Sequence, residues 1–312
     1  MNEVRTRDQA PPSCALSVVV ASIDAERSIG RSLESIERAC RGLECEILVV
    51  DASSDRTVSI IEASGARVRL SRLPSGTLTP KLWSAGLAMS RGRIVAFTTG
   101  HFTVSDTWAR ALMSGIEQGA TGVSGRLSAA ADGRPLDWAM FYLRYSAFLG
   151  VAEQGTENAA EIPADNAAYR RDALDRHAAT FADGFWEVDF HRRLRGEGAR
   201  LAFVPGADVS FGPSSSIAAL ARQRFAHGCH SGFWRVQTGM RTAWQAAVAA
   251  PLVPVVLITR IARRVLPRPA DRGRFVRALP GLFVLATAWA AGEARGALAS
   301  GRHQTASRSV PA

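Results

Sequence analysis

Short apolar runs rich in β-branched residues, each followed by a segment with helical periodicity, constrain this chain most. The runs lie at 16–22 (LSVVVAS), 46–51 (EILVVD) and 94–98 (IVAFT), and each is typical of a buried strand. Between the first two, Ile29, Leu33 and Ile36 recur at i, i+4 and i+7, which predicts an amphipathic helix. The alternation predicts an α/β fold with a mostly parallel central sheet and helices on both faces.

In a parallel sheet, ligands bind beyond the carboxyl ends of the strands, so the residues that follow Val20, Val50 and Phe97 are the first candidates for a site. Further along, Asp165 and Asn166 are expected to start a helical region. The segment 187–195 is expected to form a strongly charged helix.

The positive charge of the chain is concentrated in one segment. The net charge of the 312 residues is +10, and residues 260–277 alone contain seven arginines against Asp271. A nucleic-acid groove would spread its basic residues over a domain, so we expect no nucleic-acid partner. Basic residues beside apolar segments indicate contact with anionic lipid headgroups instead.

Several common site motifs are absent from the sequence. There is no G-x-x-x-x-G-K-[ST], no G-x-G-x-x-G after the first strand and no G-x-S-x-G, which excludes a P-loop and argues against a dinucleotide site or a hydrolase elbow. The four cysteines are too few for a disulfide scaffold, and the first dozen residues lack a signal-peptide core. These features predict reduced thiols and a cytoplasmic location.

The stretches LSVVVASIDAERSIGRSLESI and EILVVDASSDRT resemble the N-terminal half of the family 2 glycosyltransferases, which have the GT-A fold. The resemblance implies a nucleotide-sugar donor, with a UDP-type donor preferred, because a carboxylate at a strand end can accept the imide N–H of uracil. It assigns that role to Asp51. The residues expected to frame the nucleotide are Ala21, Ser22, Asp24 and Ser53. Asp51 as a turn or helix cap remains the alternative.

The stretch LWSAGLAMSRGRIVAFTTGHF resembles the family segment that precedes its metal motif. That motif is normally Asp-x-Asp, whose carboxylates hold a divalent cation against the donor diphosphate. Here Thr99, Gly100 and His101 stand in its place. Three alternatives remain open: an altered site in which His101 helps to hold Mn²⁺ or Mg²⁺, a metal-independent enzyme that uses arginines, or a protein that has lost catalysis.

Two further stretches extend the resemblance. IPADNAAYRRDAL implies that Asp165 and Asn166 bind sugar hydroxyls and that Arg170 or Arg171 faces phosphate. GFWEVDFHRRLRGEGARLAFVP resembles the acidic helix of the family and puts Glu187 at the position of the catalytic base, with Asp189 two residues on. Residues two apart on a helix point about 200° apart, so only one of the two carboxylates can face the donor. Solvated helices remain the alternative for both stretches.

The stretch ARQRFAHGCHSGFWR is comparable with the family region of a Gln-x-x-Arg-Trp motif, but only Gln223, Arg224 and Arg235 match, so processivity is not supported. The resemblance implies that Arg224 approaches donor phosphate or acceptor. A basic amphipathic helix packed on the domain is the simpler alternative.

Two apolar runs, 243–259 and 278–292, flank the basic segment and contain three prolines. They are at or below the length needed to cross a bilayer of about 30 Å. If both crossed, the basic connector would lie outside, against the positive-inside tendency. Interfacial or re-entrant helices fit better, and a buried hairpin is the alternative.

Together these features predict a disordered segment 1–14, a GT-A domain 15–240, membrane-associated helices 241–300 and a disordered tail 301–312. The resemblance implies an inverting transfer of a sugar to a lipid-linked or polysaccharide acceptor at the cytoplasmic face of the inner membrane. The second hypothesis is a catalytically silent nucleotide-binding or scaffolding protein of the same fold.

Overall fold

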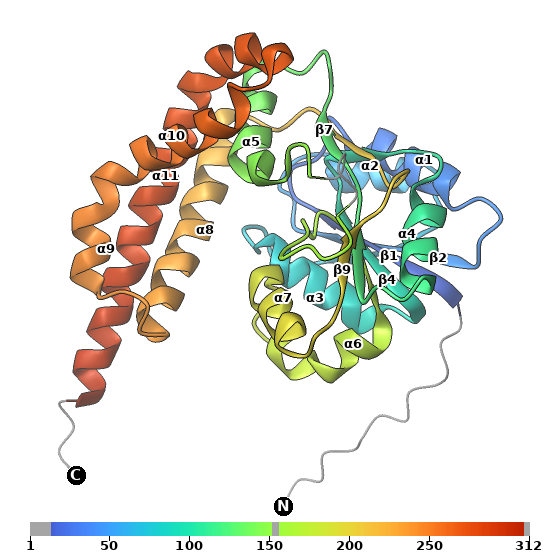
Figure 1. Ribbon diagram of the computed structural model, residues 1–312, viewed down its shortest axis with the longest axis horizontal. Coiled ribbons are helices and arrows are strands. Elements are labelled where there is room, and N and C mark those ends of the chain that lie inside the picture. The colour runs from blue at the N-terminus through green and yellow to red at the C-terminus, as the bar shows by residue number, and fades with distance from the viewer. Residues whose placement is uncertain (1–13, 152–155, 309–312) are drawn as a thin grey trace, which may run out of the picture.

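The computed structural model describes residues 14–151 and 156–308, and its centre is a seven-stranded mixed sheet (Figure 1). The strand order is β3-β2-β1-β4-β8-β6-β9. The strands are β1 (Cys14–Ser22), β2 (Cys45–Asp51), β3 (Val68–Arg72), β4 (Gly92–Thr99), β6 (Gly122–Ser124), β8 (Asn166–Arg170) and β9 (Leu201–Phe203). Strands β1 to β4 are mutually parallel, which confirms the predicted α/β class.

A smaller three-stranded sheet, of order β5-β10-β7, lies beside the first. Its strands are β5 (Phe102–Val104), β7 (Leu127–Ala129) and β10 (Val209–Phe211). The helices of the sheet-containing part are α1 (Ile29–Ala39), α2 (Thr57–Ala63), α3 (Thr79–Met89), α4 (Trp108–Glu117), α5 (Pro135–Tyr145), α6 (Arg171–Arg176) and α7 (Glu187–Gly196), with short 3₁₀ turns η1 (Ser146–Phe148) and η3 (Ala178–Phe181).

Strand β1 shows why the apolar runs form the centre of the fold. Val18 and Val20 pack into the core on one face of the sheet, whereas Val19 and Ala21 pack into the core on the other. Successive side chains of a strand point to opposite faces, so a strand covered on both sides must be apolar throughout. The run LSVVVAS meets that requirement.

Strand β8 corrects one prediction. The segment that begins at Asn166 is a strand and not a helix, and the helix begins only at Arg171. β8 is inserted between β4 and β6 and runs antiparallel to both. Ala167, Ala168 and Tyr169 are completely buried there, so burial in the sheet overrides the local preference of alanine for a helix.

The C-terminal part is helical and stands beside the sheet domain (Figure 1). It consists of α8 (Ile217–Gln237), α9 (Ala243–Ala249), η4 (Ala250–Leu252), α10 (Val253–Val265) and the long α11 (Pro269–Arg308). α11 continues to Arg308, so the prediction of a disordered tail from residue 301 is wrong for 301–308. That segment contains no proline, and the helix continues through it. The rest of the tail and residues 1–13 lie outside the described residues, and Cys14 begins β1.

Glycines allow α8 and α11 to approach each other closely. Gly228 and Gly232 of α8 face Gly292 and Gly296 of α11, and a Cβ at any of the four would overlap the backbone of the facing helix. Both pairs have the G-x-x-x-G spacing, which presents the two glycines on one helix face. The ion pair between Arg235 and Glu293 crosses the same contact.

We expect Gly296→Ala to lower the free energy of unfolding by about 1–3 kcal/mol, because the added methyl group would push the two helices apart. Gly273→Ala is the matched control in the same helix. A Cβ there meets only the end of the Arg277 side chain at 3.9 Å, so the better helix propensity of alanine should raise stability by up to about 1 kcal/mol. Urea denaturation of both variants tests this, and equal effects would contradict it.

Candidate active site

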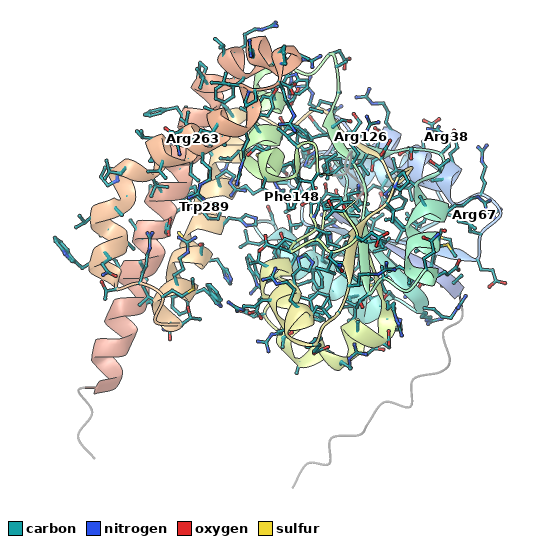
Figure 2. The ribbon with its side chains drawn as sticks, in the orientation of Figure 1. Arg38, Arg67, Arg126, Phe148, Arg263 and Trp289 are labelled. Atoms are coloured by element: carbon teal, nitrogen blue, oxygen red, sulfur yellow. The ribbon has the colours of Figure 1, made fainter. Side chains whose placement is uncertain are left out.

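A cavity of about 550 Å³ separates the sheet domain from the C-terminal helices. α3, α5, η1, η3 and α7 contribute to one wall, and α8 and α11 form the other. Figure 2 places Phe148 on the sheet-domain side and Trp289 on the helical side. The charged and imidazole side chains in the lining are Arg144, Asp165, Asp183, Glu187, Asp189, Arg192, Arg224, His227, His230 and Arg235.

Glu187 is the first residue of α7 and lines this cavity. Burial, and then the negative charge of Asp165, raise the pKa of the Glu187 carboxyl to about 7, although the helix N-terminus and Arg144 act in the opposite direction. A carboxyl with a pKa close to neutrality can take up a proton and release it at physiological pH. Glu187 therefore lies in the cavity as a carboxyl group that can exchange a proton near neutral pH, and its role as the base stays a prediction.

Arg144 was not singled out by the sequence analysis. Its guanidinium donates to both carboxylate oxygens of Asp165, each at 2.8 Å, and both side chains line the cavity beside Glu187. The desolvated pair is held together by two parallel hydrogen bonds, and Asp165 carries the negative charge that acts on Glu187. Arg144 comes from α5, in a stretch with no recognisable motif, so the sequence offered no signal for it.

Arg224 provides positive charge, and none of the described carboxylates forms an ion pair with it. Its guanidinium lies 4.5 Å from the ring centroid of Trp289, and the buried Nε has no hydrogen-bond partner within the described residues. Burial, and then repulsion from Arg144, lower the pKa of Arg224 to about 9, so the side chain is still charged at neutral pH. A charged group without a counter-ion in a cavity is suited to bind an anionic ligand.

Asp189 also lines the cavity, but its carboxylate is engaged. It accepts a hydrogen bond from Arg193 at 2.9 Å and pairs with Arg192. Burial raises the pKa of Asp189, but these two arginines more than compensate, so the net shift is downward. Of the two predicted carboxylates, Glu187 remains the one that is free to react.

Ala21, Thr99 and His101 lie around a second, much smaller cavity of about 20 Å³, at the carboxyl ends of β1 and β4. Thr79 and Arg144 belong to the walls of both cavities, which makes the two neighbours. The structure therefore brings the predicted first turn and the position of the missing metal motif to the edge of the site.

The residues around His101 do not fit a cation site. Its Nε2 lies 3.1 Å from the carbonyl oxygen of Ile23 and its Nδ1 lies 3.3 Å from the Ser28 hydroxyl, so both ring nitrogens have partners. Burial lowers the pKa of the imidazole. Over residues 14–151 and 156–308, no group of three His, Cys, Asp or Glu side chains is arranged to hold a metal ion.

Asp51 lies at the carboxyl end of β2 and is 1% exposed, and it lines neither of these two cavities. Its carboxylate accepts hydrogen bonds from the Ser53 hydroxyl at 2.6 Å and the Ser53 amide at 3.0 Å. The same hydroxyl accepts from the amide of Asp24, whose own carboxylate accepts from Ser54. The first turn and the second strand end are thus joined by hydrogen bonds, beside the buried and unpartnered Ser22 hydroxyl.

Asp24 precedes the first helix but does not cap it. The helix begins at Ile29, after Ser28, and Asp24 has a positive φ of 47°. Its carboxylate instead holds the amide of Ser54 at 2.9 Å. Asp24 therefore connects the two turns at the edge of the sheet, and does not stabilise the helix terminus.

Asn166, Arg170 and Arg171 are not arranged as predicted. Asn166 is completely buried, accepts from the indole of Trp108 at 2.7 Å and donates to the carbonyl of Ala207. Because β8 runs antiparallel to β4, Arg170 and Arg171 come at the opposite edge of the sheet, about 13 Å from Asn166 along the strand. Arg170 pairs with Asp172 there, and Arg171 donates to the carbonyl of Gly92.

Trp186 and the histidines of α8 connect the two walls of the cavity. The indole of Trp186 stacks on the His230 ring at 3.9 Å between centroids, and His227 lies 6.3 Å from it. Burial, and then repulsion from Arg224, lower the pKa of His227 well below its usual value, so its ring is neutral. His227 and His230 therefore line the same cavity as Glu187. Among residues 14–151 and 156–308, no third His, Cys, Asp or Glu side chain completes a metal site with them.

The profile of the family described as Glycosyl transferase family 2 matches residues 17–178, which is more than half of the chain. The chain belongs to this family. Its members are glycosyltransferases of class EC 2.4 that use a nucleotide-sugar donor and an acceptor, and the sheet described above is of the GT-A type.

A curated relative, glucosyl-3-phosphoglycerate synthase of Mycolicibacterium paratuberculosis, is 40% identical over 89 residues. The match covers 26% of this chain and 27% of the relative, so the chain spans little more than a quarter of that protein's length. Two crystal structures of S. aureus TarS are similar to it. One has a TM-score of 0.43 at 17% identity and covers 69% of this chain and 39% of that one. The other, TarS 1–349, has a TM-score of 0.49 at 14% identity and covers 86% and 90%.

We expect Asp165→Asn to lower the pKa of Glu187 by about one unit, because the substitution removes a negative neighbour and releases Arg144 from its partner. The acid limb of the pH profile of kcat/KM should move to lower pH by the same amount. Asp183→Asn is the control, since Asp183 lines the same cavity but pairs with Lys81 at 3.2 Å. An unchanged acid limb in Asp165→Asn would contradict the assignment.

Proposed function

We propose that the protein is an inverting glycosyltransferase that moves a sugar from a UDP-type donor to a lipid-linked or polysaccharide acceptor. The observation that carries the proposal is the placement of a carboxyl group with a pKa of about 7 and a guanidinium in the same cavity, neither of which has an ion-pair partner among the described residues. A transfer of this kind needs a base for the acceptor hydroxyl and positive charge for the leaving diphosphate.

In the proposed reaction, Glu187 removes the proton of the acceptor hydroxyl as its oxygen bonds to the anomeric carbon. The bond from that carbon to the donor phosphate breaks, and its electron pair leaves with the nucleoside diphosphate. A single attack from the face opposite the diphosphate inverts the anomeric centre. Arg224 is the group we assign to the charge that develops on the diphosphate, with Arg144 held close by through Asp165.

The nucleotide is assigned to the turns at the carboxyl ends of β1 and β2. Ser22 lies opposite Asp51 in the sheet register, and Asp24 is joined to the same strand end through Ser53. The Asp51 carboxylate would accept the imide N–H of a uracil base once Ser53 turns away. No step is assigned to a divalent cation, because the side chains at the position of the metal motif do not fit one.

The apolar C-terminal segments support a proposal about the acceptor and the place of the reaction. Two segments, Ala243–Val265 and Pro269–Ser300, are long and apolar enough to cross a membrane, although length and composition alone are weak support. We propose that they hold the enzyme at the cytoplasmic face of the inner membrane, where lipid-linked acceptors and growing polysaccharide are within reach.

Glu187→Gln should lower kcat by about 10²–10⁴-fold and leave the affinity for UDP unchanged, because the amide keeps the shape of the side chain but cannot accept the proton. Release of UDP from a panel of UDP-sugars, with and without added acceptor, measures the rate. Calorimetry measures UDP binding. Glu197→Gln, just beyond the other end of α7, is the control and should behave like the unaltered protein.

Nucleotide binding without turnover across the whole donor panel would instead favour the catalytically silent alternative. A near-normal rate in Glu187→Gln would leave the family assignment intact and overturn the assignment of the base.

Arg224→Ala should lower kcat by about 10²–10³-fold, because the leaving diphosphate loses its unpaired positive neighbour. Arg224→Lys should recover part of the loss. Arg222→Ala is the matched control, since Arg222 is exposed on the same helix and does not line the cavity. Turnover that disappears in EDTA and returns with Mn²⁺ would show that a cation, and not Arg224, carries this charge.

A further inference from the structure

An apolar stripe runs along one face of α9, η4 and α10. Its residues are Trp244, Val248, Leu252, Val255 and Val256, and Trp244 and Leu252 are 73% and 65% exposed. Intervals of three and four residues put these side chains on one side of a helix. Large apolar side chains that gather in one patch on a protein surface usually mark a contact with a partner or a membrane.

α11 also carries exposed apolar residues. Val276, Phe283, Val284 and Leu298 are exposed along it. At 100° per residue, the mean direction of these side chains lies roughly 180° from Gly292 and Gly296, which contact α8. One side of α11 is therefore covered by α8, and the opposite side presents apolar residues to the surroundings.

Arginines accompany this surface. Arg260, Arg263 and Arg264 are exposed on α10, and Arg272 and Arg277 are exposed near the start of α11. Figure 2 labels Arg263 on the C-terminal helices, away from the sheet. In the whole segment 260–277, Asp271 is the one acidic residue against seven arginines. The charge of the surface is thus complementary to anionic lipid headgroups.

We propose that this outer face of α9, α10 and α11, the docking face, lies in the headgroup region of an anionic bilayer, with the helices parallel to the membrane plane and not across it. This inference adds detail to the membrane location given under the proposed function. It rests on that location and not on the proposed chemistry. The apolar stripes would enter the boundary of the acyl chains and the arginines would contact lipid phosphates.

The packing of α8 on α11 is the reason for a position in the membrane plane. α8 carries Arg224, His227 and His230 into the cavity, and Arg235 of α8 pairs with the buried Glu293, which directly follows the apolar run 278–292 of α11. If α11 crossed the bilayer in this arrangement, these groups would be drawn into the hydrocarbon. Charged side chains at the bilayer centre cost several kcal/mol each.

The test uses the purified full chain and vesicle flotation. We expect binding to vesicles that contain phosphatidylglycerol and weak binding to pure phosphatidylcholine. Leu252→Glu with Val256→Glu should lower the vesicle-bound fraction at least tenfold, and Arg263→Ala with Arg264→Ala should lower the partition coefficient about 30-fold. The matched controls are Ile217→Glu, exposed at the start of α8, and Arg31→Ala with Arg67→Ala, exposed on the sheet domain. The controls should bind like the unaltered protein.

A second measurement separates a helix in the membrane plane from a spanning one. The thiol introduced by Pro267→Cys, between α10 and α11, should remain unlabelled by a membrane-impermeant maleimide in intact bacterial cells. Labelling would overturn the proposal, because the connector would then be outside. The proposal also fails if the protein binds no vesicles, or if it is a dimer that dissociates when Leu252 and Val256 are changed.

An assay of UDP release in solution, without vesicles, separates the proposal of the docking face from the proposed function. If the docking-face variants lose vesicle binding but keep turnover that depends on Glu187, both proposals stand. Turnover without any vesicle binding overturns the docking face alone. Vesicle binding without turnover overturns the proposed function and leaves the docking face in place.

Discussion

The close approach of α8 and α11 is the contact on which both functional surfaces depend. Four glycines let the two helix backbones meet, and the half-buried Arg235 pairs with the buried Glu293 across the same contact. On one side of this pair of helices, Arg224 and His227 face the cavity opposite Glu187. On the other side, α11 presents apolar residues outward. A single helix contact thus holds the cationic wall of the site and orients the docking face.

The electrostatics of the cavity depend on which of its charged side chains form ion pairs. Asp165 is neutralised by Arg144, and Asp189 is neutralised by Arg192 and Arg193. Among the residues that the structure describes, neither Glu187 nor Arg224 has an ion-pair partner. The pKa of Glu187 is raised and that of Arg224 is lowered. Burial disfavours the charged form of both groups. The carboxyl group can therefore take a proton from a substrate hydroxyl, and the guanidinium can gain a favourable partner in a substrate diphosphate.

The edge of the sheet to which we assign the nucleotide is closed by its own hydrogen bonds. Ser53 occupies the Asp51 carboxylate, and the nitrogens of His101 are bonded to Ile23 and Ser28. These contacts join the ends of β1, β2 and β4 into one edge, beside Thr79 and Arg144 of the larger cavity. Binding of a nucleotide to this edge would have to exchange the Ser53 contact for the base, which is a local rotation of one side chain.

Periodicity and motif order in the sequence determined the α/β class, the family resemblance and the positions of Glu187 and Arg224, because buried strands and site residues carry local patterns. Prediction from the sequence was wrong or silent where the role of a side chain depends on the direction of its strand or on partners distant in the chain. Asn166, Arg170 and Arg171 belong to one short stretch, yet the antiparallel insertion of β8 sends them to opposite edges of the sheet. Arg144 had no motif, and its role comes from Asp165, twenty-one residues away in the chain.

The tertiary structure alone decided the pKa of Glu187 and the side of α11 that is exposed. The first depends on burial and on the distance to Asp165 and Arg144, and neither is encoded in the spacing of residues along α7. The second depends on which face of α11 meets the glycines of α8, because an apolar helix has no outward side until another helix covers it. The sequence determined which groups are available, and packing determined which of them face one another.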